Sequence, residues 1–272
     1  LLPVYFARLC WKGLSNKEYF LRWSERLGYS SDLPSKDKSI IWIHAVSVGE
    51  VNASISLLRS LITDYPYSEI LVTTTTPTGS KLLIDRLGNK IKHQYLPVDI
   101  PFFINSFLNK WNPKILILLE TEIWPNLINI CKSRGIYSAL VNARLSEKSK
   151  KNYLNYRALI KPVIEKIDLI LTQFESDKRR FQEIVERKDI NTCGNLKFDQ
   201  DVPTELEDIS KSIKQDWSID GKYRPTLIAA STHGTEEEEV LRAFKQILKS
   251  FPNALLILVP RHLERFDKVK KL

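Results

Sequence analysis

The sequence alternates short apolar runs with longer amphipathic stretches along most of its length. The runs are rich in Ile, Leu, Val and Thr, and most are apolar without a break. Continuous apolar runs of this length are typical of parallel strands that helices cover on both faces. We therefore predict strands at 39–45, 69–75, 93–97, 114–120, 137–142, 167–173 and 190–194, in an α/β fold with a doubly wound parallel sheet.

The stretches between these runs have the periodicity of helices. In the first, Val51, Ile55, Leu58 and Ile62 recur at three- and four-residue spacing, which places them on one helix face. Comparable patterns predict helices at 51–62, 80–87, 101–110, 125–134, 147–165 and 176–187.

A polar stretch at 201–224, with one expected helix near 209–217, interrupts the alternation. A strand at 225–231, a helix at 235–251 and a strand at 253–260 then restart it. So short a second sheet would leave its faces poorly covered, and the sequence contains no Met, so we expect a truncated chain. The expected parts are an N-terminal helical segment near a membrane, a first Rossmann-like domain and the start of a second one, at 1–35, 36–202 and 203–272.

The formal net charge of +9 favours an anionic partner, either nucleic acid, a phospholipid surface or a phosphorylated substrate. A basic face in contact with solvent explains the charge equally well. The first residues, LLPVYFARLCWKG, are apolar with basic neighbours, which suits a helix lying on an anionic membrane or packed on its own domain. The three cysteines are far apart and the four histidines lack metal-ligand spacing, so we expect neither a disulfide framework nor a metal site.

Ligands of an open parallel sheet bind at the carboxyl ends of its strands, which directs attention to the loops there. After the first strand come Ser47, Gly49 and Glu50: a candidate N-cap, a glycine that allows a tight turn, and a carboxylate in a first helical turn. The helix end would favour the ionised carboxylate, which can accept a proton from a hydroxyl group. The alternative is that this glutamate only complements the helix dipole.

Three further loops of the first domain carry polar groups. The turn with Thr76, Pro77, Thr78 and Gly79 could hold a sugar or phosphate, or simply cap its helix. Two carboxylates, Glu120 and Glu122, follow a very apolar strand and need partners, for which Arg144 after the next strand is a candidate. Lys197 lies in the loop that ends the first domain, where a lysine is often only solvated.

Two loops of the second domain are candidates for binding phosphate. Ser231, Thr232 and His233 precede a helix, although four glutamates already complement that helix end. Pro260, Arg261 and His262 follow the next strand, and an arginine there can bind phosphate through two hydrogen bonds. The sequence contains no GxGxxG or Walker motif, which disfavours a dinucleotide oxidoreductase or a nucleoside triphosphatase.

Taken together, these loops resemble those of the Kdo transferases, which move 3-deoxy-D-manno-oct-2-ulosonic acid (Kdo) onto lipid A precursors. The resemblance covers essentially the whole chain. It rests on RWSERLGY (22–29), HAVSVGE (44–50), TTTTPTGS (73–80), ETEIWPN (120–126), VNARLS (141–146), GNLKFD (194–199), ASTHGTEEE (230–238) and LILVPRH (256–262).

The resemblance implies a GT-B glycosyltransferase with two Rossmann-like domains that transfers Kdo from CMP-Kdo to lipid IVA by an inverting displacement, without a metal or other cofactor. It implies Glu50 as the general base, and Glu120, Glu122 and Lys197 as groups acting at the transition state. It places the acceptor at Ser47, Gly49, Thr76, Pro77, Thr78, Gly79 and Arg144, and CMP at Ser231, Thr232, His233, Pro260, Arg261 and His262. It further implies the cytoplasmic face of the bacterial inner membrane, with no nucleic acid as partner.

The sequence ends soon after the PRH motif, whereas the family continues for most of a further domain. Two other interpretations therefore stay open. One is a GT-B transferase that uses a different nucleotide sugar. The other is a lipid- or nucleotide-binding remnant without catalytic activity.

Overall fold

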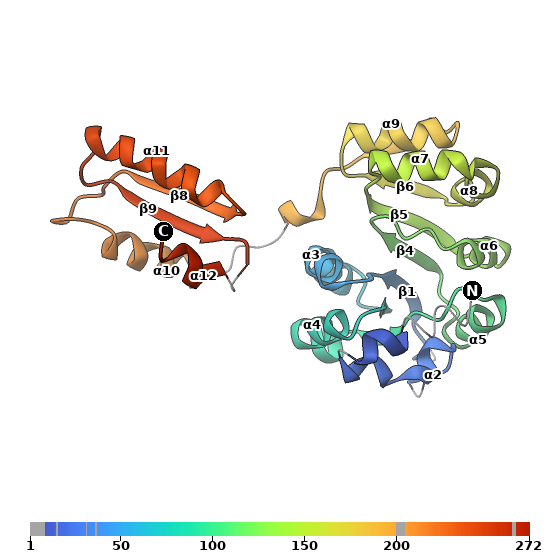
Figure 1. Cartoon of the computed structure of the whole chain (residues 1–272). Helices are drawn as coiled ribbons and strands as arrows, with labels where there is room; N and C mark the ends of the chain where they lie inside the picture. The colour runs from blue at the N-terminus through green and yellow to red at the C-terminus, as the bar shows by residue number, and fades with distance from the viewer. Residues whose placement is uncertain (1–8, 15, 31, 36, 200–204, 263–264) are drawn as a thin grey trace. The chain divides into compact units, whose positions relative to one another are not determined.

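The computed structural model describes residues 9–14, 16–30, 32–35, 37–199, 205–262 and 265–272 (Figure 1). The chain divides into two compact units, Leu1–Asp201 (unit 1) and Val202–Leu272 (unit 2). The apolar start of the sequence at 1–8, for which membrane contact was expected, lies outside the described residues. Within the described residues, no helix combines the length and apolar character needed to cross a membrane.

Unit 1 contains a sheet in which every strand pairing is parallel, in the order β3-β2-β1-β4-β5-β6-β7. Figure 1 labels its middle strands β1, β4, β5 and β6. This sheet confirms the predicted α/β class and places each predicted strand within a few residues of its observed bounds. The strands are β1 (Ser39–His44), β2 (Ser68–Thr74), β3 (Lys92–Tyr95), β4 (Ile115–Leu119), β5 (Tyr137–Ala143), β6 (Leu169–Thr172) and β7 (Ile190–Thr192).

Helices connect the parallel strands, as βαβ crossovers require. Residues 9–14 are helical, and two short elements, η1 (Lys17–Phe20) and α2 (Trp23–Arg26), follow them before the sheet. The others in unit 1 are α3 (Val48–Asp64), α4 (Pro77–Leu87), η2 (Gly88–Lys90), α5 (Pro101–Trp111), α6 (Pro125–Ser133), α7 (Glu147–Asn155), α8 (Arg157–Ile164), α9 (Glu175–Ile184) and η3 (Leu196–Asp199).

The sheet of unit 1 is covered on both faces because successive strand residues point to opposite sides. On one side Ile43 of β1 is buried with residues of α3 and α4. On the other side Trp42 is buried with residues of α5 and α6, and its ring centroid lies 4.6 Å from that of Phe107. Apolar side chains on both faces explain why the sequence of these strands shows continuous apolar runs instead of alternation.

One predicted helix is wrong in detail. The stretch 147–165 forms two helices, α7 and α8, separated at Tyr156. Tyr156 has φ −112° and ψ 30°, which lies outside the α-helical range, and Pro162 further along removes one backbone donor from α8. Helical periodicity does not reveal a break when apolar residues continue on both sides of it.

Unit 2 has a two-stranded parallel sheet made of β8 and β9. Most of its strand residues remain exposed or partly exposed, and among the described strand residues only Thr232 and Pro260 are buried. Its elements are α10 (Glu205–Asp216), β8 (Thr226–Thr232), α11 (Glu236–Ser250), β9 (Leu255–Pro260) and α12 (Phe266–Val269).

Candidate active site

The strand order of unit 1 reverses direction between β1 and β4, which are neighbours in the sheet. From β1 the chain builds outward through β2 and β3, and then returns to continue from β4 on the other side. Such a switch point leaves a crevice at the carboxyl ends of the two strands, where ligands of doubly wound sheets bind. Three predicted site residues, Glu50, Glu120 and Glu122, belong to the segments that follow these two strands.

Glu50 lies in the first turn of α3, as predicted, and its side chain is held on both oxygens. Its Oε2 accepts a hydrogen bond of 2.7 Å from the backbone N–H of Val46. Its Oε1 accepts one of 3.1 Å from the hydroxyl of Ser47. Ser47 occupies the N-cap position, but its side chain bonds Glu50 instead of capping the helix backbone. The glutamate is therefore fixed in one orientation before any ligand arrives.

The protonation of Glu50 differs from the sequence-based expectation. The residue is only 8% exposed, and this burial raises the pKa of its carboxyl group above the ordinary value. The Val46 hydrogen bond opposes the rise, and the charge of Glu120 adds to it. Burial thus outweighs the stabilisation of the ionised carboxylate that we expected from the helix end.

A single peptide unit connects the Glu50 loop to the threonine-rich loop after β2. The carbonyl of Val46 accepts hydrogen bonds from the N–H of Thr75 and from the hydroxyls of Thr75 and Thr76. Thr76 also caps α4 by accepting from the N–H of Gly79. The hydroxyls of Thr75 and Thr76 are therefore engaged within the protein, while Thr78 at the start of α4 is exposed.

The two glycines predicted for the site have different roles. Gly49 does not adopt a positive φ, and an added Cβ would meet only the Ser47 hydroxyl, at 4.0 Å. The expectation that the turn needs a glycine here is therefore wrong, because the position has room for a side chain. At Gly79 an added Cβ would lie 2.9 Å from Thr76 Oγ1 and 3.4 Å from the backbone of Ser47. Gly79 therefore allows the two loops to pack closely.

Glu120 and Glu122 follow β4, but Arg144 is not their partner. Among the described residues, no ion pair joins Arg144 to either carboxylate; its side chain is exposed, and its carbonyl accepts a hydrogen bond from Thr121. Glu122 Oε2 instead accepts a hydrogen bond of 2.8 Å from Trp124 Nε1. Burial, with the charges of Glu50 and Glu120, raises the pKa of Glu122 to about 7.

His44, at the end of β1, also lies at this edge of the sheet and was missed as a site residue. Its Nε2 is 3.9 Å from Glu122 Oε2, and its side chain is fully buried. The signal in the sequence was a histidine within an otherwise apolar strand.

Lys197 lies on η3, and its side chain is exposed. A partly buried polar network that sequence reasoning missed holds the loop before it. Leu196 N–H donates to Asn142 Oδ1, Gln173 donates to the carbonyl of Asn142, and Asn195 donates to Gln173. Asn142 adopts φ 56°, a left-handed conformation that asparagine tolerates better than most residues. These amides attach the Lys197 loop to the carboxyl ends of β5 and β6.

The candidate phosphate-binding residues of unit 2 come together at the carboxyl ends of β8 and β9. Arg261 N–H donates to the carbonyl of Thr232, and the rings of His233 and His262 have centroids 5.7 Å apart. Arg265 of the second loop donates to the carbonyl of Gly234 in the first and contacts Glu237 at 2.9 Å. The two loops therefore form one surface, with Ser231 in a left-handed conformation (φ 60°) and Pro260 ending β9.

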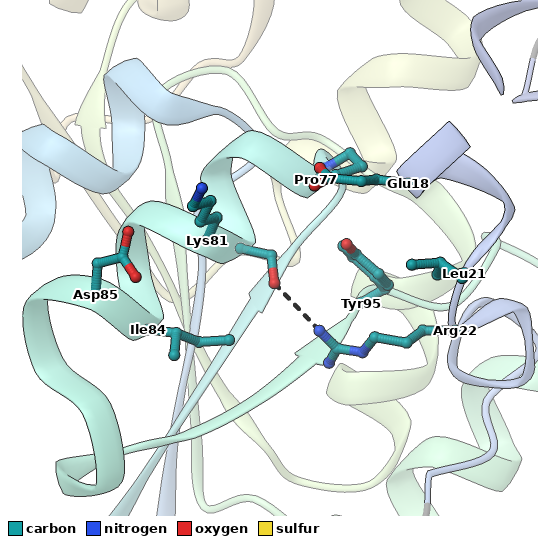
Figure 2. Close-up of a pocket in the computed structure, with 9 residues that line it drawn as sticks. Glu18, Leu21, Arg22, Pro77, Lys81, Ile84, Asp85 and Tyr95 are labelled. Atoms are coloured by element: carbon teal, nitrogen blue, oxygen red, sulfur yellow. Dashed lines mark hydrogen bonds between the residues drawn. The ribbon is translucent and has the colours of Figure 1, made fainter. Parts of the chain in front are cut away.

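A cavity of about 250 Å³ lies in unit 1 between the N-terminal elements and α4 (Figure 2). Arg22 reaches across to donate to Ser80 Oγ on α4, and it also binds both oxygens of Glu25. The guanidinium carbon of Arg22 is 4.7 Å from the ring centroid of Tyr95, and that of Arg26 is 4.1 Å from it. Pro77 lines the cavity, which therefore adjoins the threonine-rich turn.

Comparisons with known proteins bear on the family of this chain. Residues 21–200 match the family described as 3-deoxy-D-manno-octulosonic-acid transferase (kdotransferase). A 3-deoxy-D-manno-octulosonic acid transferase from Haemophilus influenzae is 40% identical over 268 residues, which are 97% of this chain and 62% of that protein. The chain thus spans somewhat less than two thirds of that relative's length.

Solved structures with low sequence identity share the fold. The UDP-GlcNAc 2-epimerase of Neisseria meningitidis aligns with a TM-score of 0.57 and 14% identity, over 86% of this chain and 67% of its own. A glycosyltransferase from Rickettsia africae aligns with a TM-score of 0.55 and 15% identity, over 87% of this chain and 65% of its own. These likenesses confirm the predicted α/β class with Rossmann-like units of the GT-B kind. Together with the family match over most of unit 1, they show that the chain belongs to the 3-deoxy-D-manno-octulosonic-acid transferase family.

Proposed function

We propose that this chain is the acceptor-binding part, with the beginning of the donor-binding part, of an enzyme that transfers Kdo from CMP-Kdo to lipid IVA. The observation that supports this most directly is the position of Glu50 in a member of the kdotransferase family. Its carboxyl group is fixed by two hydrogen bonds, and it lies in the segment that follows a strand of the switch point. In this proposal Glu50 is the general base of an inverting displacement.

The chemistry of the transfer fits the carboxylate. A sugar hydroxyl of the acceptor attacks the anomeric carbon of Kdo, the bond to the CMP phosphate breaks, and the hydroxyl proton passes to Glu50. A base is most effective when its pKa approaches the working pH, and burial shifts the pKa of Glu50 in that direction. The Val46 and Ser47 hydrogen bonds orient the carboxylate so that it need not reorganise during the reaction.

The remaining residues have complementary roles in this proposal. Glu120, Glu122 and Lys197 act on the groups that change charge in the transition state. The acceptor contacts the edge of unit 1 formed by Ser47, Gly49, Thr76, Pro77, Thr78, Gly79 and Arg144. The departing CMP anion is bound by Ser231, Thr232, His233, Pro260, Arg261 and His262 of unit 2, where an arginine and helix N–H groups suit a phosphate. The reaction as proposed requires no metal ion or other cofactor.

We place this reaction at the cytoplasmic face of the inner membrane, where an acylated acceptor would reside. Exposed apolar side chains near the start of the chain support this: Trp11 is 72% exposed and Leu14 is 81% exposed. Lys12 lies between them, and aromatic and basic side chains together suit the surface of an anionic bilayer.

The test is a transfer assay of the complete gene product with CMP-Kdo and lipid IVA, read by the mass of the product. Glu50→Gln keeps the size of the side chain but removes the base, so turnover should fall by about 10²- to 10⁴-fold. Glu175→Gln is the matched control, because Glu175 is also in the first turn of a helix after a strand but is exposed. It should keep the turnover of the unsubstituted protein.

Near-normal turnover of a folded Glu50→Gln variant would remove Glu50 from the role of base. Transfer from a UDP-sugar but not from CMP-Kdo would support the alternative nucleotide-sugar transferase. Binding of CMP-Kdo or lipid IVA without any transfer would support the remnant without catalytic activity.

A further inference from the structure

His44 presents a buried ring nitrogen to the carboxylates of the candidate site. The side chain is fully buried at the end of β1. On one side, its Nδ1 lies 3.0 Å from the carbonyl oxygen of Thr73 and 2.9 Å from the hydroxyl of Thr73. On the other side, its Nε2 is buried without a hydrogen-bond partner among the described residues. Burying a polar atom without a hydrogen bond costs folding free energy, so such an atom calls for an explanation, and a functional role is one.

The Thr73 contacts determine which nitrogen carries the hydrogen. A carbonyl oxygen can only accept, so Nδ1 must be the protonated nitrogen of the neutral ring. The Thr73 hydroxyl already accepts a 2.9 Å hydrogen bond from Trp42 Nε1, which fixes it in place. Nε2 therefore presents a lone pair, and the polar atom facing it is Oε2 of Glu122, at 3.9 Å.

The ring is uncharged near neutral pH, because burial lowers the pKa of His44 to about 4. A lone pair and an ionised carboxylate repel each other, whereas a lone pair and a carboxyl O–H attract. The charged groups that act on Glu122 favour its proton: Glu50 and Glu120 both raise its pKa. Tyr153, the other titratable group near it, is half-buried, and its own pKa is raised by burial and by Glu122.

We propose that His44 is a positioning residue whose Nε2 accepts a hydrogen bond from the O–H of a neutral Glu122 carboxyl group. The Oε2 hydroxyl of Glu122 then accepts from Trp124 Nε1 and donates to His44, while Nδ1 of His44 donates to Thr73. Trp124, Glu122, His44 and Thr73 thus form one chain of hydrogen bonds. Each member donates to the next in that order. The two atoms that are 3.9 Å apart need to approach by about 1 Å to form this bond.

This role rests on the proposed function and refines it. With Glu122 neutral, Glu50 is next to one fewer negative charge, so it can remain the ionised base. The sugar proposed for transfer is itself an acid, and a neutral Glu122 repels its carboxylate less than an ionised one. His44 touches neither sugar in this scheme and acts through Glu122.

The test is nitrogen NMR of the chain labelled with ¹⁵N-histidine, with the His44 signals assigned by their loss in His44→Gln. We expect a neutral ring protonated on Nδ1 from pH 5.5 to 8. The Nε2 signal should move with a midpoint near 7, the pKa of Glu122, because ionisation of Glu122 removes the hydrogen bond. In Glu122→Gln, whose side chain cannot ionise, the Nε2 signal should not titrate in this range. Glu120→Gln is the matched control and should retain the titration, with its midpoint moved to lower pH.

An imidazolium signal at pH 7 would overturn the proposal in favour of a charged histidine–carboxylate pair. A ring protonated on Nε2, or an Nε2 signal that does not respond to pH in the unsubstituted protein, would overturn it as well. These readings do not depend on transfer, so the proposal can fail while the proposed function stands. A protein without transferase activity that shows the titration would refute the proposed function alone.

The rate gives a second readout. If neutral Glu122 is the active form, transfer should decrease as pH rises through about 7, and Glu122→Gln should remove this decrease. Glu122→Ala loses the hydrogen bonds as well, and should be slower than Glu122→Gln by about 10-fold. Equal rates of the two variants at all pH values would contradict a role for the Glu122–His44 bond.

Discussion

The two units build the same kind of parallel sheet but protect it very differently. In unit 1, helices cover the sheet on both faces, and residues such as Trp42 and Leu118 have no exposed surface. In unit 2, the strand residues Leu227 and Ile228 are 41% and 59% exposed. Unit 1 therefore holds the hydrophobic core, because burial of apolar surface is the main source of folding free energy.

The histidines of the two units differ in burial in the same way as the strands do. Of the histidines on the strands of unit 1, His44 is fully buried and His93 is partly buried, with pKa values lowered to about 4 and about 3. Those of unit 2, His233 and His262, are exposed. A buried site shifts proton equilibria and fixes orientations, whereas an exposed loop offers groups that a ligand must still order. This difference suits a base in unit 1 and binding of an anion in unit 2.

The largest expected difference is in stability. Leu118→Ala removes a fully buried side chain and should lower the free energy of unfolding of unit 1 by about 2–5 kcal/mol. Leu227→Ala, the same change on the exposed sheet of unit 2, should cost less than about 1 kcal/mol. Urea unfolding, with hydrogen exchange to assign each transition to a unit, measures both. Equal losses would mean that the sheet of unit 2 is covered in solution.

The second difference is in the response to acid. His93 accepts from Arg22 through Nδ1 and contacts Thr74 through Nε2, and burial together with the charge of Arg22 lowers its pKa from 6.5 to about 3. The stability it contributes is complete above pH 6.5 and is lost as the pH falls toward 3. The loss should be roughly 2–3 kcal/mol between pH 6.5 and 4.5.

His93→Gln keeps an acceptor and a donor at this position but cannot titrate. Its unfolding free energy should therefore change less over the same pH range, measured by urea titration at each pH. Glu122 changes the unfolding free energy in the opposite direction, because its raised pKa stabilises the folded state as the pH falls. This contribution is the same in the unsubstituted protein and in His93→Gln. Parallel pH profiles would show that His93 is not responsible for the acid sensitivity of unit 1.

The smallest expected difference concerns two left-handed residues. Ser231→Gly should stabilise unit 2 by up to about 1 kcal/mol, because glycine adopts φ 60° without strain. Asn142→Gly gains the same relief but leaves Leu196 N–H without its acceptor, so unit 1 should lose about 1 kcal/mol overall. Urea unfolding curves of both variants measure whether each change raises or lowers the free energy of unfolding. Stabilisation by both would mean that the Asn142 side chain contributes nothing to holding the Lys197 loop.

Much of the fold followed from local patterns, since apolar runs and helical spacing report burial directly. The strands, the parallel sheet and the place of Glu50 in a first helical turn are examples. What the sequence could not supply depended on packing between distant segments. The pKa of Glu50 is raised by burial and by the charge of Glu120, which is distant in the chain. Arg144 is exposed although it follows the neighbouring strand.

His44 was missed for a related reason. In the sequence it looks like a core residue of a strand, and its importance depends on Glu122, which is distant in the chain and adjacent only through the β1–β4 pairing. Gly49 and Gly79 looked alike in their motifs, yet only Gly79 has a neighbour that a side chain would strike.

The backbone of Val46 has a consequence for genetic studies of this site. Its N–H orients Glu50 and its carbonyl ties down the threonine loop, while its side chain takes part in neither contact. Alanine scanning would therefore pass over the position as unimportant. Only proline, which has no N–H to donate, would remove the hydrogen bond to Glu50 and so reveal the role of this position. A map of mutational tolerance would record a position that accepts most residues and rejects one.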